Sequence, residues 1–132
     1  MIAIVTNTIL AIFGLFFLYT GVISIRDPVG FARSLSLETV GWSGQVEIKA
    51  QYGGFFVAAA FSQFAPLVGM LNTQAALVVS LVIFGGLISG RLGALVVSAR
   101  DEPLTSMIKS LYYIDGAGAS ASLALLFANG AF

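Results

Sequence analysis

The sequence predicts an all-α integral membrane protein, an antiparallel four-helix bundle whose helices run up-down-up-down. Of its 132 residues, 58% are hydrophobic and only 9% are charged, and the mean hydropathy is +1.00. A soluble domain normally has about 25% charged residues, so this chain has too little polar surface to fold in water. The length fits one transmembrane domain over residues 1–132.

Four apolar stretches are each close to the ~20 residues that a helix needs to cross a ~30 Å hydrocarbon core. They predict spans at about residues 4–25, 46–71, 75–99 and 104–128. The first stretch has no basic segment before it, and it exceeds the apolar region of about 7–15 residues in a signal peptide. We therefore expect it to be a retained span.

The connections carry helix-start and helix-stop residues. Asp27-Pro28 is typical of a helix start, and it predicts a short interfacial helix between the first two spans, with Trp42 at headgroup depth. An irregular amphipathic loop is the alternative. Pro66 should kink the second span near its far end unless the helix stops early. A polar turn at Asn72 then makes the second and third spans an antiparallel hairpin.

The basic residues predict the orientation. All of them fall in or near the two loops on one side, whereas the side with both termini has none. The positive-inside rule therefore places both termini on the non-cytoplasmic side. The basic residues are Arg26, Arg33, Lys49, Arg91, Arg100 and Lys109.

A polar cluster is expected inside the bundle. Helical spacing puts Glu47 and Gln51 on one face of the second span, and counting residues along the spans puts Arg91 within reach of Asp115, with Gln51 or Tyr52 nearby. An unpaired charge at that depth costs at least ~3 kcal/mol, so Arg91 and Asp115 should face each other or water. The cluster is either a substrate, ion or proton site or a buried pair that fixes helix register.

Small residues predict close helix packing. Gly86 and Gly90 form a GxxxG pattern, and the fourth span has a run without large side chains from Gly116 to Ser122. Spacing leaves open whether these faces meet inside the chain or on a partner. The expected packing glycines are Gly53, Gly54, Gly86, Gly90, Gly116 and Gly118.

The segment Glu47-Ile-Lys-Ala-Gln-Tyr-Gly-Gly resembles the motif Glu-x-[Arg/Lys]-Ala-x-Tyr-Gly-Gly of a bacterial family of small four-span proteins, DoxX-like in layout and catalogued as a domain of unknown function. The matching positions continue with Gly90-Arg91, Asp101, Pro103 and Asp115. Lys49 replaces the more frequent arginine, and Asp115 is shorter than the usual glutamate, which reduces its reach. The resemblance implies a four-span bundle in the bacterial inner membrane and implies no reaction.

The composition limits which catalytic residues and metal ligands the chain can supply. The chain has no Cys and no His, so it lacks thiolates, the commonest general base and the commonest metal and haem ligand. We expect no metal and no catalytic residues, although a membrane enzyme using Glu47 or Asp115 as acid or base is a third, least favoured hypothesis. Six basic and six acidic residues give no net charge to attract nucleic acid.

Two functions follow from these observations. The first is an accessory, assembly or structural subunit that packs, among membrane lipids, against a larger membrane complex or against its own copies. The alternative is a small carrier, or a bundle that binds a lipid, quinone or pigment, using the cluster of Arg91, Asp115 and Glu47. Aromatic side chains on the first two spans could contact such a ligand, whose identity the sequence leaves open.

Overall fold

The computed structural model describes residues 1–97 and 103–131, and every regular element in these two ranges is a helix. The predicted all-α class is confirmed. Three of the helices, α1, α5 and α6, are long and apolar enough to cross a membrane. In chain order the elements are α1 (Ile2–Arg26), α2 (Pro28–Ser34), α3 (Gly41–Ile48), η1 (Lys49–Gly54), α4 (Phe55–Phe64), η2 (Ala65–Val68), α5 (Thr73–Val97) and α6 (Ser106–Ala128).

The predicted second span is a composite of four elements rather than one regular α-helix. The α3, η1, α4 and η2 segments follow one another without a gap, and the backbone stays right-handed helical at the junctions Ile48 and Gly54. The η1 segment is a π-helix, which is rare and wider than an α-helix. Pro66 lies in the 3₁₀ turn η2, which ends at Gly69 in the left-handed region (φ 71°), so the helix stops early instead of kinking.

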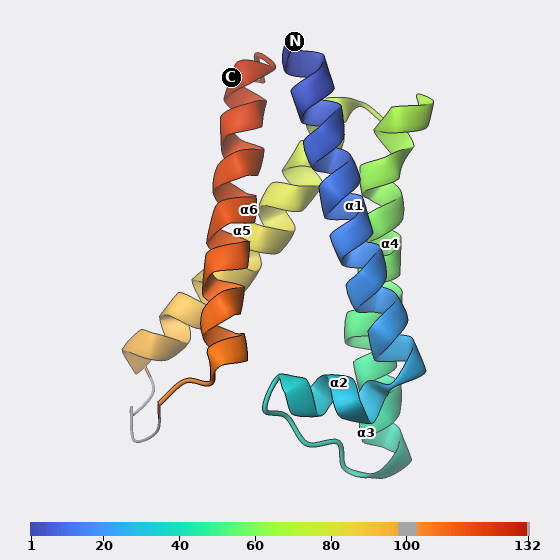
Figure 1. Ribbon diagram of the computed structural model, residues 1–132, viewed down its shortest axis with the longest axis vertical. Helices are drawn as coiled ribbons and strands as arrows, with labels where there is room; N and C mark the ends of the chain where they lie inside the picture. Colours follow the sequence, from blue (N-terminus) through green and yellow to red (C-terminus); the bar gives the residue numbers. More distant parts are fainter. Residues whose placement is uncertain (98–102, 132) are drawn as a thin grey trace.

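The helices are arranged in two adjacent pairs. In Figure 1, α1 lies beside α4, and α5 crosses behind α6, and these are the two most extensive helix contacts. Both termini lie at one end of the molecule, and α2 and α3 lie at the other. The termini and the α2–α3 segment are therefore at opposite ends of the molecule.

Phe84 lies at the centre of the aromatic part of the core, and a second apolar cluster is formed by Leu10, Ala76, Leu77 and Leu126. Phe84 of α5 is 1% exposed; its ring lies 5.1 Å from that of Phe17 and 4.9 Å from that of Phe13, measured between centroids. On its other side the ring covers Gly118 of α6, where a Cβ would lie 2.6 Å from a ring carbon. Because Gly118 has no side chain, Phe84 can join α1, α5 and α6.

Glycines also allow the close contact between α1 and the composite helix. A Cβ on Gly21 would lie 2.9 Å from the backbone nitrogen of Val57 and 3.0 Å from the carbonyl oxygen of Gly53. A Cβ on Gly53 would collide with Ile25. Both glycines are buried, and the backbones therefore meet directly at η1.

The predicted short helix after the first span is present as α2. Asp27 caps it, since the Asp27 carboxylate accepts a hydrogen bond of 2.9 Å from the Gly30 amide, and Pro28 is the first helical residue. The start signal in the sequence was therefore sufficient to place this element. Of the predicted loop between the third and fourth spans, Arg100, Asp101 and Glu102 lie outside the described residues, as do the last two residues of the third span.

Candidate functional site

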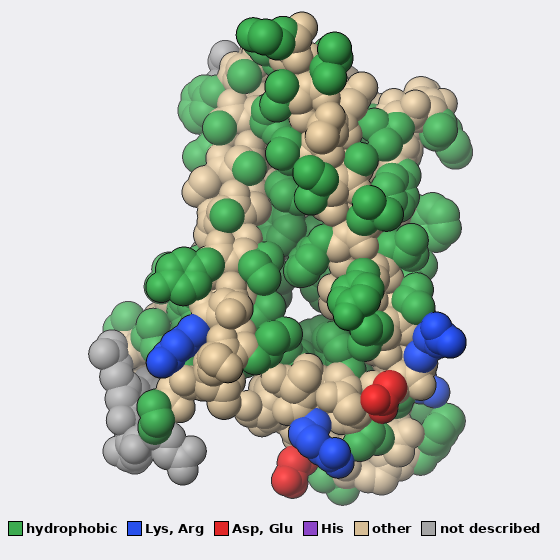
Figure 2. Space-filling model, viewed as in Figure 1, with side chains coloured by type: hydrophobic (Ala, Val, Ile, Leu, Met, Phe, Trp, Pro, Cys, Tyr) green, Lys and Arg blue, Asp and Glu red, His purple; other side chains and the backbone are tan. Residues whose placement is uncertain are grey.

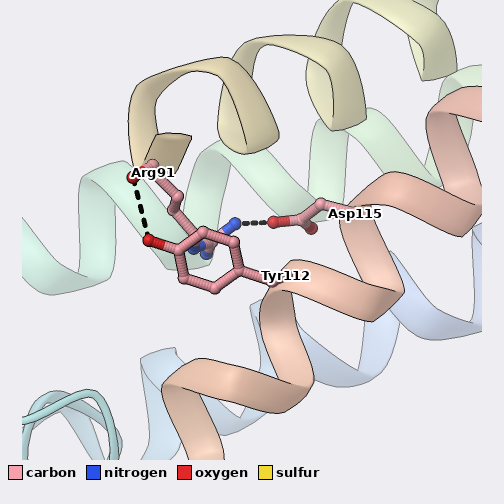
Figure 3. A network of polar contacts seen from close by, with 3 residues as sticks. All are labelled: Arg91, Tyr112 and Asp115. Atoms are coloured by element: carbon pink, nitrogen blue, oxygen red, sulfur yellow. Dashed lines mark hydrogen bonds and ion pairs between the residues drawn. The ribbon is translucent and has the colours of Figure 1, made fainter. Parts of the chain in front are cut away.

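Arg91 of α5 and Asp115 of α6 form the ion pair that the sequence predicts (Figure 3). The Asp115 side chain is 3% exposed and that of Arg91 is 24% exposed. One turn before Asp115, the Tyr112 hydroxyl donates a hydrogen bond of 2.8 Å to the backbone carbonyl of Arg91. Two contacts thus join the same turn of α5 to the same face of α6.

The geometry of the pair follows from the helices that carry it. A helical side chain leans towards the N-terminus of its own helix, so Arg91 extends back along α5 towards the level of Asp115. Because α6 is held close to α5 by Phe84 and Gly118, the guanidinium reaches the carboxylate. Each charge then neutralises the other in a region of low dielectric, where either one alone would be costly.

Tyr52, which we also expected in the cluster, is half-buried and packs against the aromatic core. Its phenol makes no hydrogen bond with Arg91 or Asp115. Its ring packs against Phe31 of α2 at 5.2 Å and lies parallel to Phe56 at 6.4 Å, measured between centroids. The π-helix η1 therefore places the Tyr52 ring between Phe31 of α2 and Phe56 of α4.

Glu47 and Gln51, which we expected in the cluster, lie elsewhere. Both are exposed, and neither makes a hydrogen bond or ion pair with Arg91 or Asp115. The buried residues of η1 and α4 are instead Gly53, Phe56, Ala59, Ala60 and Gln63. The helical face that we expected to be buried runs from Glu47 through Gln51 to Gly54, and all three of these residues are exposed. Of the predicted cluster, the structure brings only Arg91 and Asp115 into direct contact.

A second polar contact was missed from the sequence. Gln63 of α4 and Ser80 of α5 are both 0% exposed, and the Ser80 hydroxyl donates a hydrogen bond of 2.6 Å to the Gln63 side-chain oxygen. The Gln63 amide nitrogen donates to the Ala76 carbonyl at 3.4 Å. The signal was available, because a glutamine within the apolar run of residues 55–68 needs a partner.

The predicted packing glycines fall into two groups. Gly53 and Gly118 are covered by other helices, as described above, whereas Gly54 meets only its own helix. At Gly86, Gly90 and Gly116 nothing lies within 4 Å of the position that a Cβ would occupy. The GxxxG pattern of α5 therefore makes no close contact within the described part of the chain.

Among residues 1–97 and 103–131, no three acidic side chains lie close enough together to hold a metal ion. No family model, characterised protein or solved structure matches this chain. The family resemblance of residues 47–54 therefore stays a prediction, and function is inferred below from the residues themselves.

Proposed function

We propose that this chain is a four-span protein of the bacterial inner membrane that acts as an accessory or assembly subunit of a larger membrane complex. The spans are α1, the composite helix from Gly41 to Val68, α5 and α6. At about 1.5 Å per residue the composite helix is about 40 Å long, enough to cross a ~30 Å hydrocarbon core. Its division into π, α and 3₁₀ segments does not interrupt it.

The distribution of side chains supports the membrane placement. Large apolar side chains are exposed along the helices, for example Ile4 at 73%, Leu15 at 61% and Val82 at 67%. On the face in Figure 2, charged side chains gather at the end that holds α2 and α3. At that end Trp42 is 69% exposed and the Lys49 ammonium lies 5.3 Å from its ring centroid, which suits a headgroup layer.

The orientation has its own test. With both termini on the non-cytoplasmic side, alkaline phosphatase fused after Phe132 should be active, and green fluorescent protein fused there should stay dark. Retention of the chain in membranes after an alkaline wash tests insertion itself. A cytoplasmic C-terminus would refute the topology but would leave insertion intact.

The observation that carries the docking proposal is the outer face of α5. This α5 outer face comprises Val82, Gly86, Gly90, Gly93 and Val97, which all are exposed and recur at helical spacing. Its three glycines have open space above them, although the glycines that serve the internal contacts are covered. In a bilayer such faces let a second helix approach closely.

A groove continues this face towards α4. Its volume is about 370 Å³, and its lining is almost entirely apolar or small, including Ala58, Ser62, Val78 and Val82. Val82 belongs both to the groove and to the α5 outer face. A transmembrane helix of a partner could therefore bury a continuous strip of α5 and α4 while making mainly van der Waals contacts.

The docking proposal is tested by native electrophoresis of membranes solubilised in a mild detergent. The wild-type chain should migrate in a complex, and Gly86→Leu/Gly90→Leu should shift it to the free monomer because the new side chains keep the partner helix away. Ala124→Leu is the control, since it enlarges an exposed small residue of α6. A wild-type chain that runs as a free monomer would contradict the proposal.

Self-association needs a separate experiment. Two differently tagged copies are expressed together and one is purified through its tag. Recovery of the other tag, lost in the Gly86→Leu/Gly90→Leu variant, would replace the accessory assignment with a homo-oligomer. The carrier hypothesis has less support, because Asp115 is buried against Arg91 and Glu47 lies on the outside.

A further inference from the structure

A cavity of about 420 Å³ lies between α1, α2 and the first half of α6. Figure 2 shows the molecule hollowed there, between α1 and α6 and above α2. Most of its wall is apolar, with Phe16 and Ile23 on α1 and Leu111 and Ile114 on α6. Its size is within the range of sites for small molecules, about 300–1,000 Å³.

Three hydroxyl groups lie among the described residues of the cavity wall, on Tyr19, Thr20 and Ser34, and two of them already donate their hydrogen. Thr20 donates to the Phe16 carbonyl at 3.0 Å, and Ser34 donates to the Phe31 carbonyl at 2.7 Å. A hydroxyl has one hydrogen to donate and two lone pairs that accept. Both side chains therefore offer acceptors to anything that enters the cavity.

Asp27 adds a negative charge to these acceptors. One of its carboxylate oxygens accepts the Gly30 amide, and the other has no hydrogen bond or ion pair with any described residue. A Cβ on Gly30 would collide with that second oxygen, so the glycine leaves room for it. Among the described residues that line the wall, Asp27 is the only charged one, and Arg26 and Arg33 are not in the wall.

We propose that this cavity binds an aminolipid, a membrane lipid whose head carries a primary ammonium group. The ammonium would donate hydrogen bonds to Asp27 and Ser34, and an acyl chain would lie against the apolar wall of α1 and α6. A carboxylate with neighbouring acceptors selects a cationic donor. This site rests on the membrane placement proposed above, which puts the end of α1 at headgroup depth, but it does not rest on the docking of α5.

Two lipids with the same phosphate and acyl chains separate this proposal from general lipid binding. Phosphatidylethanolamine has ammonium hydrogens to donate, whereas phosphatidylcholine has the same charge and none. Native mass spectrometry of the full chain in detergent, with both lipids at equal concentration, should show an ethanolamine preference of about tenfold, the ratio given by ~1.4 kcal/mol. Equal occupancy would overturn the proposal, and so would equally tight binding of diacylglycerol.

The Asp27→Asn variant tests whether Asp27 binds the ammonium group of the lipid head. Asparagine retains the helix cap but removes the charge, so the ethanolamine preference should fall to near one while the chain stays folded. Glu38→Gln is the matched control, because it removes one carboxylate that is not in the cavity wall, and it should keep the preference. An unchanged preference in Asp27→Asn would overturn the proposal.

The Leu111→Trp variant tests whether an acyl chain of the lipid lies in the apolar part of the cavity. The larger ring should fill the apolar part of the cavity, and binding of both lipids should fall by about tenfold or more. Leu123→Trp, at a 41% exposed position of the same helix outside the cavity, should leave binding unchanged. Equal losses in the two variants would show that the lipids bind the outer surface and would refute the site. A lost complex in native electrophoresis, in contrast, would concern only the docking proposal.

Discussion

Replacing Arg91 by alanine should destabilise the protein by about 3–5 kcal/mol, because it leaves the Asp115 carboxylate buried without its counter-charge. The Asp115 side chain is only 3% exposed, so water cannot take the place of the guanidinium without opening the contact between α5 and α6. A single domain is typically stable by about 5–15 kcal/mol. The loss would therefore be a large fraction of the total.

A double-mutant cycle separates two contributions to the free energy of unfolding: the net stabilisation by the ion pair, and the cost of leaving one buried charge without its partner. Arg91→Leu/Asp115→Leu removes both charges, and we expect it to be within about 1.5 kcal/mol of wild type, since apolar replacement of a buried pair is often neutral. Each single leucine variant should have a free energy of unfolding several kcal/mol lower than that of the double variant. Arg33→Ala is the control, because Arg33 is exposed and surface substitutions usually change stability by less than about 0.5 kcal/mol.

The assay is unfolding in detergent micelles, followed by far-ultraviolet circular dichroism during a titration with sodium dodecyl sulfate. Transmembrane helices keep much of their secondary structure in this detergent, so fluorescence of Trp42, the only tryptophan, provides a second probe. If Arg91→Ala costs less than about 1 kcal/mol, the pair does not hold the bundle together. A folded Arg91→Ala chain that has lost a ligand or transport activity would instead favour the carrier hypothesis.

Three further outcomes are expected in the same unfolding assay. Gly118→Val should cost about 1–3 kcal/mol because its side chain would collide with Phe84. Gly116→Val has open space above it and should cost less than about 0.5 kcal/mol, because valine has a higher helix propensity than the glycine it replaces. Gln63→Leu should cost about 1–3 kcal/mol by leaving the buried Ser80 hydroxyl with fewer partners; combining it with Ser80→Ala should recover part of that loss. Tyr112→Phe should cost about 1 kcal/mol through its hydrogen bond to α5, and a loss above about 3 kcal/mol would indicate a wider role for this residue.

The sequence predicted those features that depend on local pattern and on charge. Asp27-Pro28 placed α2 correctly because capping and proline act within one turn. The Arg91–Asp115 pair was predictable because two lone charges in long apolar helices have few other partners. The spans of α1, α5 and α6 agree with the predicted ranges to within a few residues where the structure describes them.

Features that depend on contacts between helices were not predictable in the same way. Regular helical spacing assigned Glu47 and Gln51 to the interior, but the buried face of the composite helix is set by the close approach of Gly53 to α1. The π-helical turn at the same place has no sequence pattern of its own. Gly86 and Gly90 were expected to pack against a helix, either within the chain or on a partner. Spacing could not tell that no helix of the described chain covers them.

Contacts between helices connect α1, the composite helix, α5 and α6 into a closed ring. Gln63 and Ser80 join α4 to α5, and Arg91 and Asp115 join α5 to α6. At the end with the termini, the Asn129 side chain, just after α6, donates a hydrogen bond of 3.1 Å to Thr6 of α1. The glycine contact between α1 and η1 completes the ring.

In the membrane placement that we propose, polar contacts would have this role because lipid provides no hydrophobic force that drives helices together. Packing and hydrogen bonds would then hold the helices in register. Each helix-to-helix step of the ring carries one polar contact or one close backbone approach. The α5 outer face and the cavity beside Asp27 take no part in the ring. Changes in either of them should therefore alter binding while leaving the stability of the bundle nearly unchanged, whereas changes in the ring should do the reverse. A variant of Gly90 or Asp27 that unfolds the protein as strongly as Arg91→Ala would show that this separation of binding surfaces from stabilising contacts is wrong.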